Sequence, residues 1–333
     1  MTAALKAVLI ANDGHPIPDW LPVQLRDEGV EFGVADCYTR DDLIQHASDA
    51  DVLVVFSGRE LLNATNLAAL PACKAIVRTG SGYDNIDIEA ATRRGILLAN
   101  TPDVPTEPTA DHAVSLLFGA ARQIALQDRQ VRSGLWISKP HRPARGFQEA
   151  ALGLVGFGRI ARAVVGKLSG FHMNMLASDP FVDPQVMAAF QVQAAGLDVL
   201  LGRADFVSLH CALTKRTYHL IGERELRLMQ KHAILVNVSR GQLVDERALY
   251  RALREGWIAG AALDVTEEEP IAPDNPLLTL DNLVITPHSA AYSNLHPDSF
   301  WAATAQAIIA LAHGRWPDSV VNRKDVVPAW PLS

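Results

Sequence analysis

The chain has 333 residues, which is enough for two domains of ordinary size. A hydrophobic fraction of 49% and a charged fraction of 20% are typical of globular proteins, and the net charge of −7 argues against a general nucleic-acid or membrane binder. The cysteines Cys37, Cys73 and Cys211 lie far apart, so neither a disulfide framework nor a metal site is expected, and a reducing cytoplasm fits. Neither a signal peptide nor a membrane span is predicted.

Short apolar runs alternate with helical or mixed segments through the first hundred residues. We expect strands at residues 7–11, 30–34, 52–56, 75–78 and 97–99. Short buried strands that are separated by crossovers predict a parallel sheet.

A glycine-rich stretch, Thr79-Gly-Ser-Gly-Tyr-Asp84, follows the fourth of these strands directly. Ligands of parallel sheets bind beyond the carboxyl ends of the strands. Gly80 and Gly82 would let backbone N–H groups around Ser81 converge on an anion, such as a substrate carboxylate. The alternative is an ordinary glycine-rich connection.

A proline-rich crossing at residues 100–108 predicts a domain boundary. Thr106 is the expected cap of the next helix, which is predicted to run to about Ser133. Residues 134–150 are rich in Gly, Trp, Pro, His and Arg, so we expect irregular structure there. This segment is a candidate to arch over a neighbouring element or over a second subunit.

The apolar run at residues 152–155 predicts a buried strand, and Gly156-x-Gly158-x-x-Ala161 follows it. In a strand–turn–helix context this is a dinucleotide-binding fingerprint. Gly156 permits the tight turn, Gly158 lets a pyrophosphate approach the backbone, and Ala161 lets the helix pack on the strand. The N–H groups at the helix start would then face the phosphates. The alternative is a glycine-rich turn of any α/β protein.

Asp179 ends the next predicted strand, 21 residues after Gly158. An acidic side chain at about this spacing can accept hydrogen bonds from the ribose hydroxyls. It would also repel a 2′-phosphate, so the sequence favours NAD and makes NADP less expected. The alternative is a helix cap or turn residue before Pro180.

Five further strands and a long last helix complete the pattern. The strands are predicted at 174–177, 206–209, 234–238, 260–264 and 283–286, and the helix at about 298–313. Together with the strand at 152–155 they predict a doubly wound dinucleotide fold.

Three chemically distinct groups follow consecutive strands of this second half. Arg240 follows one strand, the acidic run Glu267–Glu269 follows the next, and His288 follows the last. Parallel strands bring all these ends to the edge that holds the fingerprint turn. Hydride transfer between a 2-hydroxy acid and a nicotinamide cofactor requires these types of side chain: a guanidinium to grip the carboxylate, a histidine to move the hydroxyl proton, and a carboxylate to orient the histidine.

Each group also has an ordinary structural interpretation. Arg240 could be a charged residue on the surface, and the acidic run could be a solvated stretch. His288 could be a histidine at a strand end whose hydrogen-bonding groups all have partners. Spacing alone does not choose among Glu267, Glu268 and Glu269.

Taken together, the motifs resemble the D-isomer-specific 2-hydroxyacid dehydrogenase family, and most closely its branch of C-terminal-binding-protein corepressors and bacterial dehydrogenase relatives. The resemblance covers nearly the whole chain. Its motifs are Arg78-Thr-Gly-Ser-Gly-Tyr-Asp-Asn-Ile-Asp87, Leu152-Gly-Leu-Val-Gly-Phe-Gly-Arg-Ile160, Leu209-His-Cys-Ala-Leu-Thr214, Val236-Asn-Val-Ser-Arg-Gly-Gln-Leu-Val-Asp-Glu246, Gly260-Ala-Ala-Leu-Asp-Val265, Glu269-Pro270 and Thr286-Pro-His288.

The resemblance implies two doubly wound parallel-sheet α/β domains. The substrate domain would be flavodoxin-like and discontinuous, over 1–101 and 293–333, and the Rossmann cofactor domain would span 102–292. The family also implies a homodimer through the cofactor domains and a small 2-keto or 2-hydroxy acid as substrate.

The resemblance further assigns roles to individual residues. Arg240 would bind the substrate carboxylate, His288 would act as acid and base, and Glu269, among the three candidates, would pair with His288. Asp264 would hold the nicotinamide carboxamide. The implied cofactor contacts are Ser81, Thr109, Gly156, Gly158, Arg159, Ile160, Asp179, His210, Cys211, Thr217, Val238, Ser239, Asp264, His288 and Ala291. The implied substrate contacts are Ser81, Gly82, Arg240 and His288.

The sequence departs from the family pattern at three places. Ala161 takes the third fingerprint position, Ala212 stands where family members often have proline, and Ala291 stands where the corepressor branch usually has tryptophan. The small side chain of Ala291 should enlarge or reshape the substrate pocket. Two other functions stay open: an NAD(H)-sensing interaction protein like the corepressors, and phosphite-type oxidation on the same scaffold. Formate oxidation is disfavoured, because the family's formate enzymes carry Gln at the position of Glu269.

Overall fold

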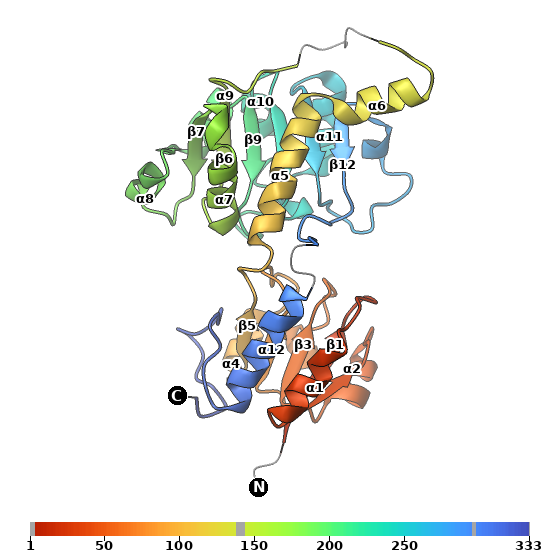
Figure 1. Ribbon diagram of the computed structural model, residues 1–333, viewed down its shortest axis with the longest axis vertical. Helices are drawn as coiled ribbons and strands as arrows, with labels where there is room; N and C mark the ends of the chain where they lie inside the picture. The colour runs from red at the N-terminus through yellow and green to blue at the C-terminus, as the bar shows by residue number, and fades with distance from the viewer. Residues whose placement is uncertain (1–3, 138–143, 295–297, 333) are drawn as a thin grey trace. The chain divides into compact units, whose positions relative to one another are not determined.

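The computed structural model describes residues 4–137, 144–294 and 298–332. The chain divides into two compact units (Figure 1). The first unit comprises Met1–Pro105 and Ser293–Ser333, and the second comprises Thr106–Tyr292. The chain passes from one unit to the other at 105/106 and at 292/293. Within the described residues, no helix is both long and apolar enough to cross a membrane.

The first unit is built on a parallel five-stranded sheet of order β2-β1-β3-β4-β5, which is the flavodoxin-like order. Its strands are β1 (Leu5–Ala11), β2 (Val30–Val34), β3 (Val52–Val55), β4 (Ala75–Arg78) and β5 (Leu97–Asn100). Its helices are α1 (Trp20–Asp27), α2 (Arg40–Ala47), α3 (Ala64–Ala68), α4 (Ile88–Arg93) and α12 (Ser299–Ala312).

The two faces of this sheet are covered by different helices. α1 and α12 pack on one face, and α2, α3 and α4 pack on the other. α12 comes from the end of the chain and is fixed to the sheet by apolar burial and by a hydrogen bond between the hydroxyls of Thr79 and Thr304, 2.8 Å apart. The C-terminal segment therefore belongs to the first unit because its apolar face completes that unit's core.

The second unit is built on a parallel seven-stranded sheet of order β12-β11-β10-β9-β6-β7-β8. Its strands are β6 (Ala151–Val155), β7 (Asn174–Ser178), β8 (Gln193–Ala194), β9 (Phe206–Leu209), β10 (Ile234–Asn237), β11 (Gly260–Leu263) and β12 (Leu283–Ile285). The order reverses beside β6, as in dinucleotide-binding folds. The predicted fold class, two doubly wound parallel-sheet domains, is confirmed.

Helices cover both faces of this sheet as well (Figure 1). α5 (Thr106–Ala121) and α7 (Arg159–Lys167) pack on one face, while α9 (Leu197–Arg203), α10 (Glu223–Leu228) and α11 (Glu246–Glu255) pack on the other. The remaining helices are α6 (Ile124–Arg132), α8 (Pro184–Ala189) and the short 3-10 helices Ser169–Phe171, Gly241–Leu243 and Pro276–Thr279.

Three local predictions were wrong. The helix expected to reach Ser133 is two helices, because Gln123 adopts a left-handed backbone with φ of 55° between α5 and α6. Thr106 is the first residue of α5 rather than its cap. β8 was not predicted, since its two residues are exposed and form no apolar run. Part of the segment 134–150, residues 138–143, lies outside the described residues.

Several residues predicted to end strands lie just beyond them. They are Phe56, Val238, Asp264 and Thr286. The last three are the first residues of the loops at the carboxyl edge of the second unit's sheet.

Candidate active site

The loop between β6 and α7 has the geometry of a phosphate-binding turn. Gly156 has φ of +89°, and a Cβ added there would lie 2.7 Å from the backbone N of Cys211, so only glycine fits. A Cβ at Gly158 would meet nothing within 4 Å, and no side chain caps α7, which begins with Arg159 and Ile160. The start of α7, with no side-chain cap and with open space beside Gly158, fits the pyrophosphate of a dinucleotide.

Asp179 lies against this turn. Its Oδ2 accepts a hydrogen bond from the backbone N–H of Phe157 (2.9 Å), and its Oδ1 accepts one from that of Phe181 (2.9 Å). Asp179 is thus also a turn residue, as the structural alternative predicted. Each carboxylate oxygen can accept a further bond, so the half-buried side chain still has capacity for ribose hydroxyls.

The loop after β9 brings His210, Cys211 and Thr217 to the same edge. Burial lowers the pKa of His210 to about 4 and raises the pKa of the Cys211 thiol to about 11, so both side chains are neutral near pH 7. Thr217 Oγ1 donates to the carbonyl of Ala212 (2.7 Å) and accepts from the N–H of Thr214 (2.7 Å). Thr217 therefore fastens the loop at the position where Ala212 replaces the common proline.

Arg240 is held by a tight turn after β10. Asn237 donates through Nδ2 to the carbonyl of Arg240 (2.8 Å) and accepts through Oδ1 from the N–H of Ser239 (3.0 Å). A Cβ at Gly241 would lie 1.9 Å from the carbonyl carbon of Thr266, so the loops after β10 and β11 touch through a glycine. This contact sets Arg240 beside the acidic run.

His288 and Glu269 form a direct pair, with His288 Nδ1 2.6 Å from Glu269 Oε2. The N–H of Thr266 donates to Glu269 Oε1 (3.1 Å). Burial by itself would raise the pKa of Glu269, but the hydrogen bond and charge of His288, the N–H of Thr266 and the charge of Arg240 together lower it below its ordinary value. Glu269 is therefore an anion at neutral pH, and the three predicted catalytic side chains lie together.

The other two glutamates of the acidic run have different surroundings. Glu267 Oε1 lies 3.0 Å from His219 Nε2 and accepts the N–H of Glu246 (2.9 Å). Glu268 is exposed. The geometry thus selects Glu269 as the partner of His288, a choice that spacing alone left open.

Asp264 is almost fully buried, with 1% of its surface exposed. Its carboxylate accepts from the hydroxyl of Thr286 (2.6 Å) and from the N–H groups of Ser289 (3.0 Å) and Ala290 (2.9 Å). The sequence predicted a carboxamide contact for Asp264, and the structure adds that this carboxylate fastens the loop carrying His288. His112 of α5 also contacts Thr286, at 2.9 Å. No motif pointed to His112, and Thr286 was noticed only as part of Thr286-Pro-His288.

The remaining predicted residues are distributed as follows. Val238 and Ser239 follow β10, with Ser239 Oγ bonded to the carbonyl of Leu209 (3.0 Å). Thr109 is buried in α5, and Ala291 follows the fastened loop. Ser81 and Gly82 lie in the first unit, on the loop after β4, and their part in binding a carboxylate stays a prediction.

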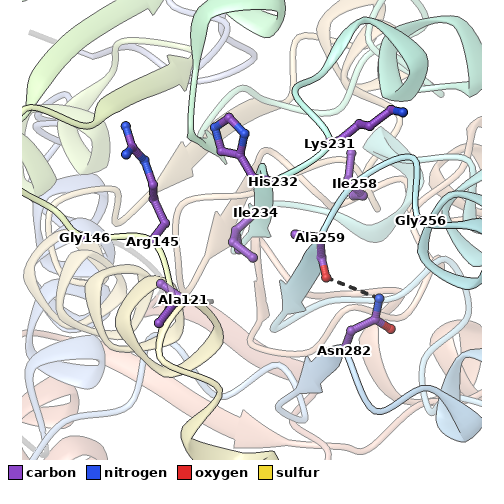
Figure 2. Close-up of a pocket in the computed structure, with 11 residues that line it drawn as sticks. Ala121, Arg145, Gly146, Lys231, His232, Ile234, Gly256, Ile258, Ala259 and Asn282 are labelled. Atoms are coloured by element: carbon purple, nitrogen blue, oxygen red, sulfur yellow. Dashed lines mark hydrogen bonds between the residues drawn. The ribbon is translucent and has the colours of Figure 1, made fainter. Parts of the chain in front are cut away.

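A cavity of about 690 Å³ lies at the opposite, amino-terminal edge of the same sheet (Figure 2). It is bordered by Ile234, the first residue of β10, and by Ala259 and Asn282, which precede β11 and β12. The Nδ2 of Asn282 donates to the carbonyl of Ala259 (3.3 Å; dashed in Figure 2). This cavity is therefore separate from the site that contains His288.

A doubly wound sheet with an open phosphate turn at its switch point, beside an arginine and a His–Glu pair, defines a nicotinamide-dependent oxidoreductase. Residues 114–290 match the family described as D-isomer specific 2-hydroxyacid dehydrogenase, NAD binding domain. The glyoxylate reductase of Korarchaeum cryptofilum is 44% identical over 287 residues, covering 85% of this chain and 86% of that protein. This chain therefore belongs to the D-isomer-specific 2-hydroxyacid dehydrogenase family, whose members act on CH–OH groups.

Two solved structures are similar over nearly the whole chain. The D-lactate dehydrogenase of Aquifex aeolicus, complexed with NAD and lactic acid, is 26% identical with a TM-score of 0.82, covering 92% of this chain and 96% of that one. An acyclic imino acid reductase in complex with NADPH and D-Arg is 26% identical with a TM-score of 0.86, covering 95% and 100%.

Proposed function

We propose that the protein is an NAD-dependent reductase of small 2-keto acids, which transfers a hydride between the nicotinamide and a 2-keto or 2-hydroxy acid. The observation that carries the proposal is the 2.6 Å pair of His288 and Glu269 on the edge that holds Arg240 and the phosphate turn. The 44% identity to a glyoxylate reductase supports a small 2-keto acid as substrate.

In this mechanism the bound nicotinamide supplies or accepts the hydride. Arg240 holds the substrate carboxylate through paired N–H donors. The anionic Glu269 accepts a hydrogen bond from the Nδ1–H of His288, so Nε2 is the nitrogen left to exchange a proton with the substrate. During reduction, the carbonyl carbon receives the hydride and its oxygen receives the Nε2 proton. Oxidation reverses both transfers.

The proposal specifies NAD rather than NADP. The carboxylate of Asp179 lies against the phosphate turn, where it can accept ribose hydroxyls and would repel a 2′-phosphate. The imino acid reductase is in complex with NADPH and the D-lactate dehydrogenase with NAD, so proteins of this fold bind both cofactors. The side chain after β7, Asp179 in this chain, would then set the preference for NAD.

The proposal also includes a homodimer through the second unit. None of the residues of α6 is buried, and four apolar side chains in the helix or just after it are exposed: Ile124 (56%), Val131 (51%), Leu135 (53%) and Trp136 (85%). Apolar surface of this kind is commonly covered by a partner. We expect a second copy of the chain to cover it, and light scattering of wild type and Trp136→Glu would show a dimer and a monomer, respectively.

The direct test is oxidation of NADH in the presence of a panel of 2-keto acids, from glyoxylate and hydroxypyruvate to phenylpyruvate and branched-chain acids, with NADPH in parallel. We expect turnover of small acids with NADH, while turnover of the bulkier ones would show that Ala291 widens the pocket. If no acid is turned over while NADH still binds, the proposed activity is wrong. An NAD(H)-dependent pull-down and a phosphite oxidation assay would then separate the two alternatives.

A further inference from the structure

His112 lies on α5 and reaches the loop that carries His288. Its Nε2 is 2.9 Å from Thr286 Oγ1 and 3.4 Å from Asp264 Oδ1. His112 is the seventh residue of α5, the helix with which the second unit begins, and its side chain is 24% exposed. The proposed mechanism does not use it.

The direction of these hydrogen bonds follows from the number of protons available. The hydroxyl of Thr286 has a single proton to donate. Its Oγ1 lies 2.6 Å from Asp264 Oδ1, and a carboxylate oxygen can only accept a hydrogen bond. Thr286 Oγ1 therefore donates to Asp264 and must accept from His112. The proton of His112 is thus on Nε2, and the three residues form one chain of donors from α5 to the buried carboxylate.

The carboxylate at the end of this chain holds the loop on both sides of His288. Asp264 Oδ1 binds Thr286 before it and the N–H of Ser289 after it, and Oδ2 binds the N–H of Ala290. The backbone of His288 itself is left-handed, with φ of 51°, and its N–H donates to the carbonyl of Asp264 (2.7 Å). Non-glycine residues adopt this conformation uncommonly, so the bonds to Asp264 on both sides of His288 help to hold it.

We propose that His112 is a positioning residue for His288: by donating from Nε2 to Thr286, it fixes the Thr286–Asp264 bond and hence the loop that presents the His288 imidazole. This inference rests on the proposed role of His288. Without the donor at position 112, the Thr286 hydroxyl loses one of its two partners. The loop then relaxes around the left-handed residue, and the imidazole moves away from its productive position.

Three variants separate positioning from simple packing. His112→Phe keeps a ring of similar size and removes the donor. His112→Gln keeps a donor, since glutamine Nε2 can occupy the place of histidine Nε2. Ser115→Ala, one turn further along α5, is the matched control because its hydroxyl donates to the carbonyl of Asp111 on its own helix (2.8 Å).

We expect His112→Phe to lower kcat by between about tenfold and a hundredfold while the Kd for NADH is unchanged. His112→Gln should recover most of the wild-type kcat, and Ser115→Ala should retain all of it. Thr286→Val should reproduce the loss, and the His112→Phe/Thr286→Val double variant should lose no more than either single variant. Thr286→Val also tests the inference if His112→Phe does not fold.

A second readout does not depend on turnover. The imidazole of His288, assigned with His288→Gln, is titrated by NMR of histidine-labelled protein. Its titration midpoint should shift in His112→Phe and Thr286→Val and stay at the wild-type value in His112→Gln. Wild-type kcat and titration in His112→Phe, or an equal loss in His112→Gln, would overturn the inference. If wild-type protein turns over no acid, the proposed function fails, and the NMR titration alone decides whether His112 positions His288.

Discussion

The Nδ1 atom of His288 lies 2.6 Å from Oε2 of Glu269, and no other glutamate of the acidic run makes this contact among the described residues. In the proposed mechanism, this carboxylate orients the imidazole and leaves Nε2 as the atom that exchanges a proton. Replacing Glu269 by Gln removes the charge and keeps the shape. We predict that Glu269→Gln lowers kcat for keto-acid reduction by about a hundredfold and moves its pH optimum to lower pH, because His288 is then protonated less readily.

The pH dependence of kcat in wild type and Glu269→Gln measures this effect. Glu268→Gln, which changes an exposed neighbour, is the control and should match wild type. An unshifted pH profile in Glu269→Gln would remove Glu269 from the proposed acid–base pair. Since the pKa of Glu269 is lowered, its anion should persist to lower pH than that of an ordinary glutamate, and the pair should be lost as the pH falls through that lowered pKa.

Arg240 is predicted to act on the substrate rather than on the fold. Arg240→Lys keeps the positive charge and removes the paired donors, so kcat/KM for the keto acid should fall by about tenfold to a hundredfold with little change in NADH binding. Arg203→Lys, at the exposed end of α9, is the matched control. Steady-state kinetics with a fixed saturating NADH concentration check this, and an unaltered kcat/KM would exclude Arg240 from the site.

Asp179 is predicted to set the choice of cofactor. In Asp179→Ala the repulsion of a 2′-phosphate and the acceptors for the ribose hydroxyls both disappear. The ratio of kcat/KM for NADH to that for NADPH should fall by about tenfold or more. Asp183→Ala, a change at the cap of α8, is the control and should leave the ratio unaltered. The proposed ribose contact is wrong if the two variants behave alike.

Gly241 is predicted to be indispensable for the contact between the loops after β10 and β11. A Cβ there would lie 1.9 Å from the carbonyl carbon of Thr266, so Gly241→Ala must displace backbone. We expect it to reduce the free energy of unfolding by about 2 kcal/mol or more, because overpacking of this kind is costly. Gly166→Ala in α7, where a Cβ would meet nothing within 4 Å, should stabilise by about 0.5–1 kcal/mol. Urea denaturation of both variants measures the difference.

Asp205 is predicted to make folding sensitive to acid. Burial would raise its pKa, but the hydrogen bonds from Arg145, the N–H of Ala151 and His232 lower it overall. Asp205 Oδ1 lies 2.9 Å from Arg145 Nε and 2.6 Å from His232 Nε2. Arg145 and His232 are among the residues that line the cavity in Figure 2. A depressed pKa in the folded state means that the stabilisation is present above the unfolded-state pKa and is lost as the pH falls through the folded-state pKa.

Asp205→Asn should therefore destabilise the protein by about 1–3 kcal/mol at neutral pH and by less at about pH 3. Urea denaturation at the two pH values measures this. The exposed Asp198, on α9, offers Asp198→Asn as the control, with a smaller loss at neutral pH. An equal loss for Asp205→Asn at both pH values would show that its charge is not the cause.

The sequence by itself determined the alternating strands, the two sheets and the family. Runs such as Val52–Val55 and Phe206–Leu209 are short, apolar and buried on both faces. The local sequence is therefore sufficient to predict them as buried strands. Gly156 and Gly158 could also be interpreted without coordinates, since a tight turn between a strand and a helix restricts the residues that it accepts. The fingerprint turn and the residues that follow each strand can therefore be identified from the sequence alone.

The tertiary structure alone decided what depends on contacts between distant parts of the chain. The break at Gln123 interrupts an apolar spacing that continues on both sides, and β8 forms by pairing rather than by hydrophobicity. Glu269 instead of Glu267 faces His288 because the loops after β10 and β11 meet at Gly241. His112 reaches Thr286 across 174 residues of sequence, and no local pattern encodes such a contact, because only the packing of α5 on the sheet creates it.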